Sequence, residues 1–431
     1  MLISSMIFVL FLFCLLGMEI AWAIGLACFG YLFFAQFGDA AIPFVLVSQQ
    51  MTVGVDAFVL LAIPLFIFAG ELMNEAGVTQ RIVRFAAAFV GHRQGGLANV
   101  GVTANYIMSG TSGSSLADAA ATGTVLIPEM RKRGFSPAFS SAVIASAATV
   151  GPIVPPSISF ILLGAIVNLS VAKLFLAGVI PGTIMFIAMF ILTWWLCKTR
   201  NYPTEPRVPW NERGEATISG LASLVAPIII ISSILFGIAT PTESAAIAVF
   251  YVLFLGVFIY RSLTFRAILK CAGETALSTS IIMLTVATSK LFAWIAVKEN
   301  LGEMLTNALL FISNDVFVLL ILINILLLIL GMIMEILPIM LILAPVLFPL
   351  LEGLGVDPIH FGVVMVLNLM IGMITPPIGL NLFVMNAISG VGVIDIFKAA
   401  VPYFIILVGV LILVTYVPEL STTLPNYFYP K

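Results

Sequence analysis

Two proline-rich motifs interrupt long apolar stretches of this chain, and they restrict the possible folds more than any other feature. Residues 151–157 read GPIVPPS within the apolar run 138–168, and residues 372–378 read GMITPPI within the run 358–388. Proline has no amide hydrogen and disfavours helix in the residue before it. Each run is therefore predicted to break into two half-helices.

The surroundings of these breaks are predicted to be a lipid bilayer. Of the 431 residues, 61% are hydrophobic and only 9% are charged, whereas soluble domains carry roughly 25% charged residues. A broken helix at membrane depth is tolerated only where its backbone lines a cavity or is buried in protein. Two breaks in corresponding halves indicate the binding site of a transporter. The simpler alternative, ordinary proline kinks, does not account for two motifs in matching positions.

We expect an all-α polytopic membrane protein with about ten transmembrane helices and two re-entrant hairpins. The hairpins are predicted at about 96–130 and 316–351, and surface helices at 74–93 and 299–315. Because the first basic residue is Arg81, the N-terminal apolar segment is predicted to span the membrane and not to be a signal peptide. Runs of suitable length place the ten spans at 2–17, 20–36, 57–73, 138–168, 178–197, 217–236, 242–260, 275–296, 358–388 and 399–417.

Basic residues predict the orientation. Thirteen of the 18 Lys and Arg residues fall in four segments, 74–95, 131–137, 198–215 and 261–270. The positive-inside rule places these segments in the cytoplasm, so both termini are expected outside. The segment 198–215, rich in proline, is predicted to be a cytoplasmic linker.

An internal repeat divides the chain. The segment 126–156 superposes on 347–377 without a gap and with nine identities, both Pro-Pro pairs among them. In the same register the basic residues 131–133 become 352–354, which carry no basic residue. Opposite charge at equivalent turns predicts two inverted repeats, residues 1–197 and 216–431, on either side of the linker.

The predicted breaks also indicate which ligands this region could bind. Helix ends expose free carbonyls and amides, and carbonyl oxygens with the hydroxyls of Ser109, Ser112 and Thr375 suit a small cation. Half-helix N-termini favour an anion. Asp118 and Glu335 would either neutralise a cation or cap a helix. Asn381 would contact a substrate or join two helices. A serine-rich hairpin tip is also consistent with simple close packing.

Other polar residues carry weaker predictions. Glu71, Glu243 and Lys290 lie near predicted span ends, where snorkelling or capping is expected. The two histidines and four cysteines are scattered singly, so no disulfide or transition-metal site is predicted.

The motifs together resemble a known family. Residues 109–118 (SGTSGSSLAD), 150–157 (VGPIVPPS), 239–246 (ATPTESAA) and 374–381 (ITPPIGLN) are similar to those of the large membrane subunit of TRAP (tripartite ATP-independent periplasmic) transporters. The resemblance covers essentially the whole chain. It implies sodium-driven uptake of an organic acid across the bacterial inner membrane by an elevator motion. It also implies two partners, a small four-helix membrane subunit, expected here as a separate chain, and a periplasmic substrate-binding protein.

The resemblance further implies a set of site residues. The first sodium site would comprise Ser109, Ser112, Gly151, Val154 and Pro156, and the second Gly331, Gly372, Thr375 and Ile378. The substrate candidates are Ser114, Ser115, Asp118, Glu335 and Asn381.

Two other functions stay open from the sequence. One is a stand-alone ion-coupled carboxylate symporter of the same architecture, which needs no binding protein. The other is an intramembrane enzyme, which is disfavoured because no His or Lys base accompanies the serines of residues 109–115. The expected partners include membrane lipid and exclude nucleic acid.

Overall fold

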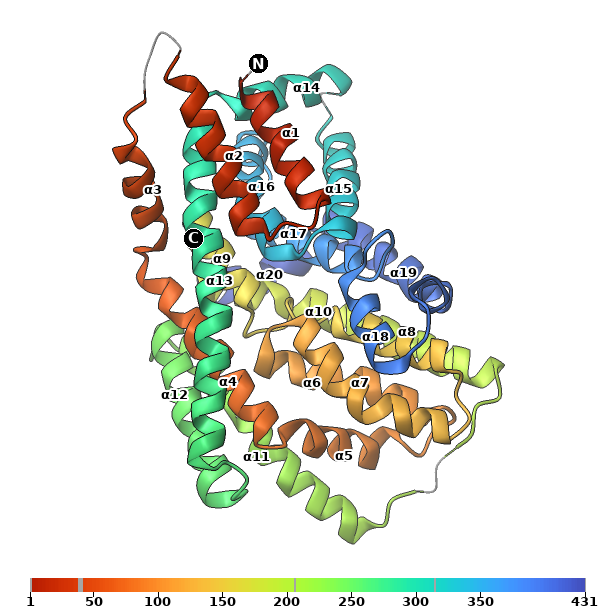
Figure 1. Ribbon diagram of the computed structural model, residues 1–431. Helices are drawn as coiled ribbons and strands as arrows, with labels where there is room; N and C mark the ends of the chain where they lie inside the picture. The colour runs from red at the N-terminus through yellow and green to blue at the C-terminus, as the bar shows by residue number, and fades with distance from the viewer. Residues whose placement is uncertain (1, 38–41, 205–206, 314, 431) are drawn as a thin grey trace.

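The computed structural model describes residues 2–37, 42–204, 207–313 and 315–430, and these residues form an all-helical protein (Figure 1). The only strand-like pairing among them is an isolated bridge between Gln94 and Thr204. The prediction of an all-α fold is confirmed.

The first half of the chain contains ten α-helices and a short 3₁₀ helix between α3 and α4. They are α1 (Leu2–Leu15), α2 (Ile20–Ala35), α3 (Val45–Val55), the 3₁₀ helix (Phe58–Leu61), α4 (Ala62–Glu75), α5 (Val78–Val90), α6 (Gly96–Ser112), α7 (Ser115–Lys132), α8 (Pro137–Ala148), α9 (Ile158–Val167) and α10 (Val171–Thr199).

The second half contains ten more α-helices and one π-helical turn. They are α11 (Trp210–Leu235), α12 (Pro241–Phe254), the π turn (Leu255–Ile259), α13 (Phe265–Lys298), α14 (Leu301–Ile312), α15 (Val316–Ile333), α16 (Ile336–Gly353), α17 (Pro358–Gly372), α18 (Leu380–Ser389), α19 (Val393–Tyr416) and α20 (Glu419–Phe428).

Eight helical segments within the described ranges are individually long and apolar enough to cross a membrane, so the chain is a polytopic membrane protein. Two of them, α15 and α16, are the arms of the second predicted hairpin. The predicted spans at 2–17 and 20–36 form the shorter apolar helices α1 and α2. The two proline-rich runs form pairs of short helices, α8 with α9 and α17 with α18, as the proline motifs predict.

The helix order repeats along the chain. The starts of α5 to α10 recur in α14 to α19 at a nearly constant spacing. The turns after α7 and α16 match in detail, because Gly134 and Gly355 both have positive φ, 83° and 84°. Ser136 and Asp357 then accept hydrogen bonds from the amides that begin α8 and α17. Equivalent sequence positions thus form the same local structure.

Some boundaries differ from those predicted. α13 has 34 residues and begins inside the predicted basic loop, because Thr264 caps its first turn. α10 likewise begins earlier, at Val171, where Ser170 accepts a hydrogen bond from the Lys173 amide. α11 begins at Trp210, which shortens the predicted linker at its C-terminal end. α20 was not predicted.

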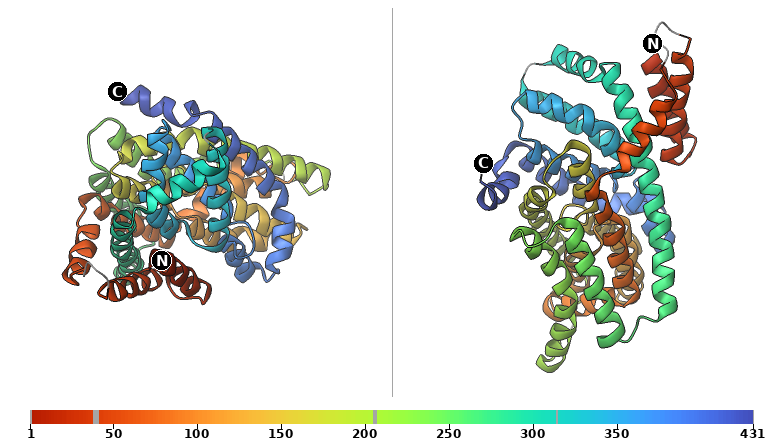
Figure 2. Two further views of the ribbon diagram at one scale, coloured as in Figure 1. Left: turned by 90° about the horizontal axis from the view of Figure 1, so that it is seen from above. Right: turned by 90° about the vertical axis from the view of Figure 1, so that its left-hand side faces the viewer.

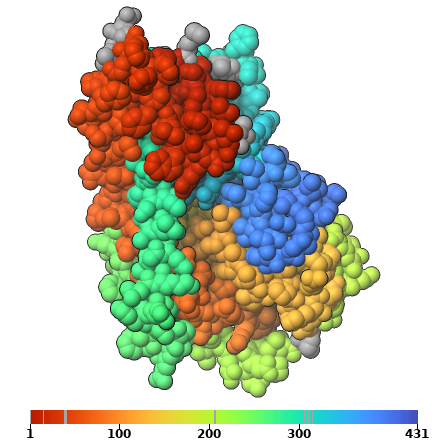
Figure 3. All heavy atoms as spheres, viewed as in Figure 1, coloured from red at the N-terminus to blue at the C-terminus, as the bar shows by residue number. Residues whose placement is uncertain are grey.

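The long helix α13 organises one side of the molecule. α2, α3, α4 and α16 pack along it. α1, α2 and α14 gather at one end of the molecule and α5 and α11 at the other, as two views show (Figures 1 and 2). In Figure 3, α13 (green) is exposed on the surface below the N-terminal helices.

The two hairpins pack crosswise against the broken helices. α7 contacts α8 and also α18, while α15 contacts α17 and α16 contacts both α17 and α9. Each hairpin therefore touches the break of its own half and a half-helix from the other half.

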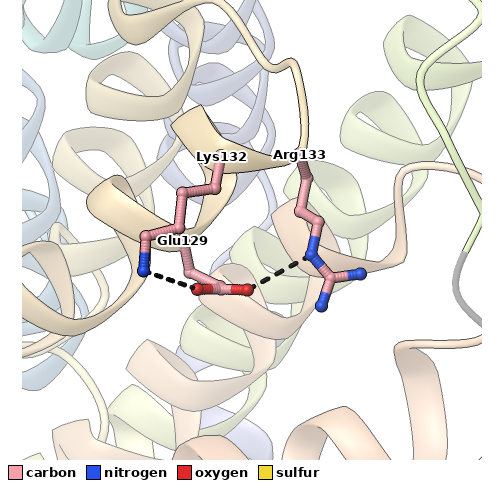
Figure 4. Close-up of polar contacts among 3 residues, drawn as sticks. All are labelled: Glu129, Lys132 and Arg133. Atoms are coloured by element: carbon pink, nitrogen blue, oxygen red, sulfur yellow. Dashed lines mark hydrogen bonds and ion pairs between the residues drawn. The ribbon is translucent and has the colours of Figure 1, made fainter.

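The end of the first hairpin away from its tip is an exposed charged turn. Glu129 forms ion pairs with Lys132 at 3.6 Å and with Arg133 at 3.2 Å (Figure 4). Exposed pairs of this kind contribute little stability.

Inverted repeats would place the ends of α7 and α16 on opposite sides of the membrane. In intact cells we expect a cysteine at Lys132 to react only with membrane-permeant thiol reagents, and a cysteine at Gly353 to react also with impermeant ones. Both positions are exposed, and the parent protein without an added cysteine gives the background. Labelling of both positions from the same side would contradict the inversion.

Candidate functional site

The first break occupies the segment between α8 and α9. α8 ends at Ala148, tight turns follow, and Ser157 caps α9 by accepting a hydrogen bond from the Phe160 amide. The Ser157 hydroxyl in turn donates to the Pro152 carbonyl. Much of the interrupted backbone is therefore satisfied locally, in a segment that is almost wholly buried.

The tip of the first hairpin lies directly on this break. A Cβ atom at Gly113 would lie 3.0 Å from the Pro156 carbonyl oxygen, and one at Gly151 would lie 2.9 Å from Oδ2 of Asp118. Gly113 also has a positive φ of 60°, which favours glycine. The approach of tip and break thus depends on two residues without side chains.

Asp118 is anchored beneath the tip. The Ser112 hydroxyl donates to Oδ1 of Asp118 at 2.6 Å, and Asp118 is fully buried. Its other oxygen, Oδ2, has no hydrogen-bond partner among the residues that the structure describes. A buried carboxylate oxygen without a donor is energetically costly, and a bound cation close to Gly151 would satisfy it.

The second break docks on the second hairpin through backbone hydrogen bonds. The amides of Ile378 and Gly379 both donate to the Met332 carbonyl at 3.2 Å. A Cβ atom at Gly372 would lie 2.4 to 2.8 Å from backbone atoms of Gly331. The hydroxyl of Thr375 donates to the Ile371 carbonyl at 2.9 Å, and its oxygen lone pairs stay available for a further ligand.

Asn381 joins the two halves. Its side-chain amide donates to the Ser115 hydroxyl at 2.7 Å and to the Ala145 carbonyl at 3.1 Å. Asn381 lies in the first turn of α18, just after the second break, whereas its partners belong to the first hairpin and to α8. The interhelical hydrogen bond considered from the sequence is thus present.

Both hairpin tips and both breaks line one cavity of about 310 Å³. Residues 112–117 of the first tip and residues 335–337 of the second line this cavity. Pro152 of the first break and Met373 of the second also line it. α4 and α13 close another side. The remaining polar lining residues are Glu71, Asn74, Ser159 and Ser278.

This cavity contains two acids and no base. Glu71 and Glu335 line it, and none of its lining residues is Lys, Arg or His. Glu335 occupies the N-cap position of α16 but makes no capping hydrogen bond. Of the two roles predicted for Glu335, side-chain capping is therefore absent from this structure.

The predicted residues divide by their position. Ser112, Ser114, Ser115 and Glu335 line the cavity. Asp118 and Asn381 lie behind it, fully buried, and Ser109 is buried with its hydroxyl bonded to the Tyr106 carbonyl at 2.5 Å. Gly151, Val154 and Pro156 belong to the first break. Gly372 and Ile378 lie where the second break meets its hairpin at Gly331 and Met332, and Thr375 lies between them in the break.

Part of the cavity wall is not predicted by the sequence. Glu71 is predicted only at a span end, and Asn74, Ser159 and Ser278 are not among the candidates. Glu71 and Asn74 lie one turn apart near the end of α4. An acid and an amide spaced by three residues on an apolar helix lie on the same face, and this spacing could have indicated a shared polar site. By contrast, Glu243 forms the predicted cap, since its carboxylate accepts from the Thr240 amide at 2.8 Å.

No cluster of three or more His, Cys, Asp or Glu side chains that would hold a metal occurs in the described part of the chain. A cation at this site would therefore depend mainly on carbonyl and hydroxyl oxygens, with no more than two carboxylates among the described residues. Such hard oxygen ligands suit an alkali or alkaline-earth cation better than a transition metal.

Comparison with known proteins gives a consistent result. A family described as "Tripartite ATP-independent periplasmic transporter, DctM component" matches residues 7–420. The sialic acid TRAP transporter large permease protein SiaM of Vibrio cholerae is 39% identical, with 88% of this chain and 89% of that protein covered. The 2,3-diketo-L-gulonate TRAP transporter large permease protein YiaN of Escherichia coli is also 39% identical, with 95% and 97% covered.

Further comparisons agree. The C4-dicarboxylate TRAP transporter large permease protein DctM of Pseudomonas aeruginosa is 36% identical, with 86% of this chain and 87% of that protein covered. The solved structure of the YdaH transporter of Alcanivorax borkumensis superposes with a TM-score of 0.64 at 15% identity, over 87% of this chain and 88% of that one. The latter likeness concerns the fold alone. The relatives are named as transporter permeases, in agreement with the prediction that the chain is not an enzyme.

The contact between Gly331 and Gly372 gives a direct test of the packing. We expect Gly372→Ala to lower the stability of the folded protein by about 1–3 kcal/mol, because the new methyl group overlaps the Gly331 backbone. The measurement is thermal unfolding in detergent. Gly409→Ala in α19 is the matched control, since nothing lies within 4 Å of a Cβ there, and it should be neutral or stabilising. Equal effects of the two substitutions would contradict the proposed close contact.

Proposed function

Since the chain belongs to the family of TRAP transporter large permeases, we propose that it is the large membrane subunit of a sodium-coupled importer of organic acids. The observation that carries this proposal is the charge of the central cavity. The cavity lies between both hairpin tips and both helix breaks, yet it offers acids and no basic side chain.

A carboxylate passenger would be repelled in such a cavity unless a positive charge accompanied it. Two unit charges of the same sign 4 Å apart repel by about 4 kcal/mol at an effective dielectric constant of 20. Bound cations would reverse the sign of this interaction. The amides at the start of α16, which no side chain caps, and the hydroxyls of Ser114 and Ser115 would provide the remaining contacts with the passenger. This electrostatic requirement would couple binding of the anion to binding of the cations.

We assign the cations to the two breaks. The first site would use Ser109, Ser112, Gly151, Val154 and Pro156, beside the unpaired Oδ2 of Asp118. The second would use Gly331, Gly372, Thr375 and Ile378, whose segments are already in contact. Each site would thus join a hairpin to its break, so that the cation stabilises the closed arrangement of both.

The proposed partners follow from the family. A periplasmic substrate-binding protein would deliver the organic acid, and a small four-helix membrane subunit would assemble with this chain in the inner membrane. The three relatives are named for sialic acid, diketogulonate and C4-dicarboxylates. The feature shared by these compounds is a carboxylate, and this is the passenger class that we propose. The hairpins and broken helices would move as one body in an elevator motion past α13, with both termini periplasmic.

Reconstitution of the complete transporter tests the function. We expect proteoliposomes to accumulate the organic acid only with an inward sodium gradient and only when the cognate binding protein is added outside. Candidate acids are N-acetylneuraminate, 2,3-diketo-L-gulonate and succinate, each with its binding protein. Uptake that is unchanged when the binding protein is omitted would favour a stand-alone symporter, and uptake that is unchanged without sodium would contradict the coupling.

Thr375 provides a residue-level test. We expect Thr375→Val to raise the sodium concentration for half-maximal uptake by about tenfold, since one oxygen ligand contributes on the order of 1.4 kcal/mol. Thr285→Val is the matched control, because Thr285 makes the same hydrogen bond to the carbonyl four residues before it, at 2.8 Å, on α13. An unchanged sodium titration for Thr375→Val would remove this residue from the site.

A further inference from the structure

A second cavity, of about 510 Å³, lies farther along α9 and α13. The central cavity is lined by the start of α9 and by residues 278–282 of α13, whereas the second is lined by the end of α9 and by residues between 286 and 297. α3, which lies beside α13 in Figure 1, closes it on the outside. The ten residues of α9 are about 15 Å long, so the two cavities border neighbouring stretches of the same two helices.

The second cavity differs from the first in charge. Lys290 is its one charged lining residue, and no acidic side chain of the described residues forms an ion pair with it. Lys290 is exposed, and the base of its side chain packs against α3, because a Cβ at Gly54 would lie 2.7 Å from Cβ of Lys290. An unpaired basic residue on a membrane helix, facing a cavity, indicates a functional site.

Neutral polar groups surround this lysine. Gln50 and Asn168 line the cavity, and so does Ser289, which is 1% exposed. The Ser289 hydroxyl is buried, and no atom within the described ranges forms a hydrogen bond with it. An ammonium group together with amide and hydroxyl donors is the arrangement that binds a carboxylate.

We propose that this second cavity is a carboxylate-binding site through which the passenger passes on its way to the central cavity, with Lys290 as the residue that attracts it. The inference rests on the proposed function. With the basic loops in the cytoplasm, the end of α9 is its outer end, so the passenger meets the lysine before it meets the acids of the central cavity. The lysine raises the local concentration of the anion, and the cations at the breaks then retain it.

The experiment measures the anion preference of the cavity directly. In the complete transporter, Ala293→Cys places a thiol one helical turn from Lys290, about 5–6 Å away between Cβ atoms. Its rates of reaction with an anionic and a cationic methanethiosulfonate reagent are compared, with the parent protein as background for the four native cysteines. We expect Lys290→Met to lower the ratio of the anionic to the cationic rate by about tenfold, because a unit charge at that distance in water changes each rate by roughly threefold. Lys290→Arg should preserve the ratio.

Uptake of the organic acid is measured on the same variants without the added cysteine. Lys290→Met is expected to raise the KM for the organic acid at least fivefold and to leave the sodium titration within twofold of the parent. The matched control is Lys298→Met, because Lys298 lies on the same helix outside the cavity, over the Trp294 ring at 5.8 Å. It should leave both measurements unchanged.

Two results would overturn the proposal. An unchanged reagent ratio in Lys290→Met would show that the charge of Lys290 does not act inside the cavity. The ammonium group would then point toward the membrane surface, as in a snorkelling residue. A changed ratio with an unchanged KM would show that the passenger does not use the site. If the parent protein takes up none of the acids, the proposed function fails, and the reagent ratio still reports whether the cavity prefers anions.

Discussion

The architecture depends on hydrogen bonds to the backbone amides and carbonyls that are left free where two helices are interrupted inside a membrane protein. Each unpaired backbone group in hydrocarbon costs several kcal/mol, so an interrupted helix persists only if other parts of the chain surround it. Here the hairpins provide this surrounding. The second break donates two amides to the Met332 carbonyl, and the first is covered by the tip at Gly113. The hairpins are therefore required by the breaks, and each pair forms one structural unit.

The same requirement explains the glycines at the contacts. Gly113, Gly151, Gly331 and Gly372 lie where a tip meets a break, and a Cβ at any of them would lie within about 3 Å of a neighbouring atom. Close approach brings backbone carbonyls and hydroxyls of two segments to one place, which is the geometry that a small cation needs. Packing and the proposed cation binding would therefore depend on the same residues, and a larger side chain would disturb both.

Much of this arrangement could be predicted from the sequence because its signals are local. Paired prolines predict the breaks, and the internal repeat predicts that the turns at Gly134 and Gly355 match. The cavity wall could not be predicted in the same way. Glu71 and Ser278 belong to helices that are distant in sequence from the breaks, and only the packing of α4 and α13 brings them there. The length of α13 was also underestimated, because its first turns carry basic residues that resemble a loop.

The two halves differ in structure between α13 and the segment of the first half that corresponds to it. In the register of the repeat, the range of α13 corresponds to the segment in which α3, the 3₁₀ helix and α4 replace one continuous helix. The interruption at Asp56 and Ala57 divides the first-half element between the two cavities, since α3 lines the second and α4 the first. α13 borders both without a break. The two cavities are therefore bordered on one side by a single helix, whereas on the other side the chain is interrupted between them, a difference that the similar sequences of the two proline motifs do not predict.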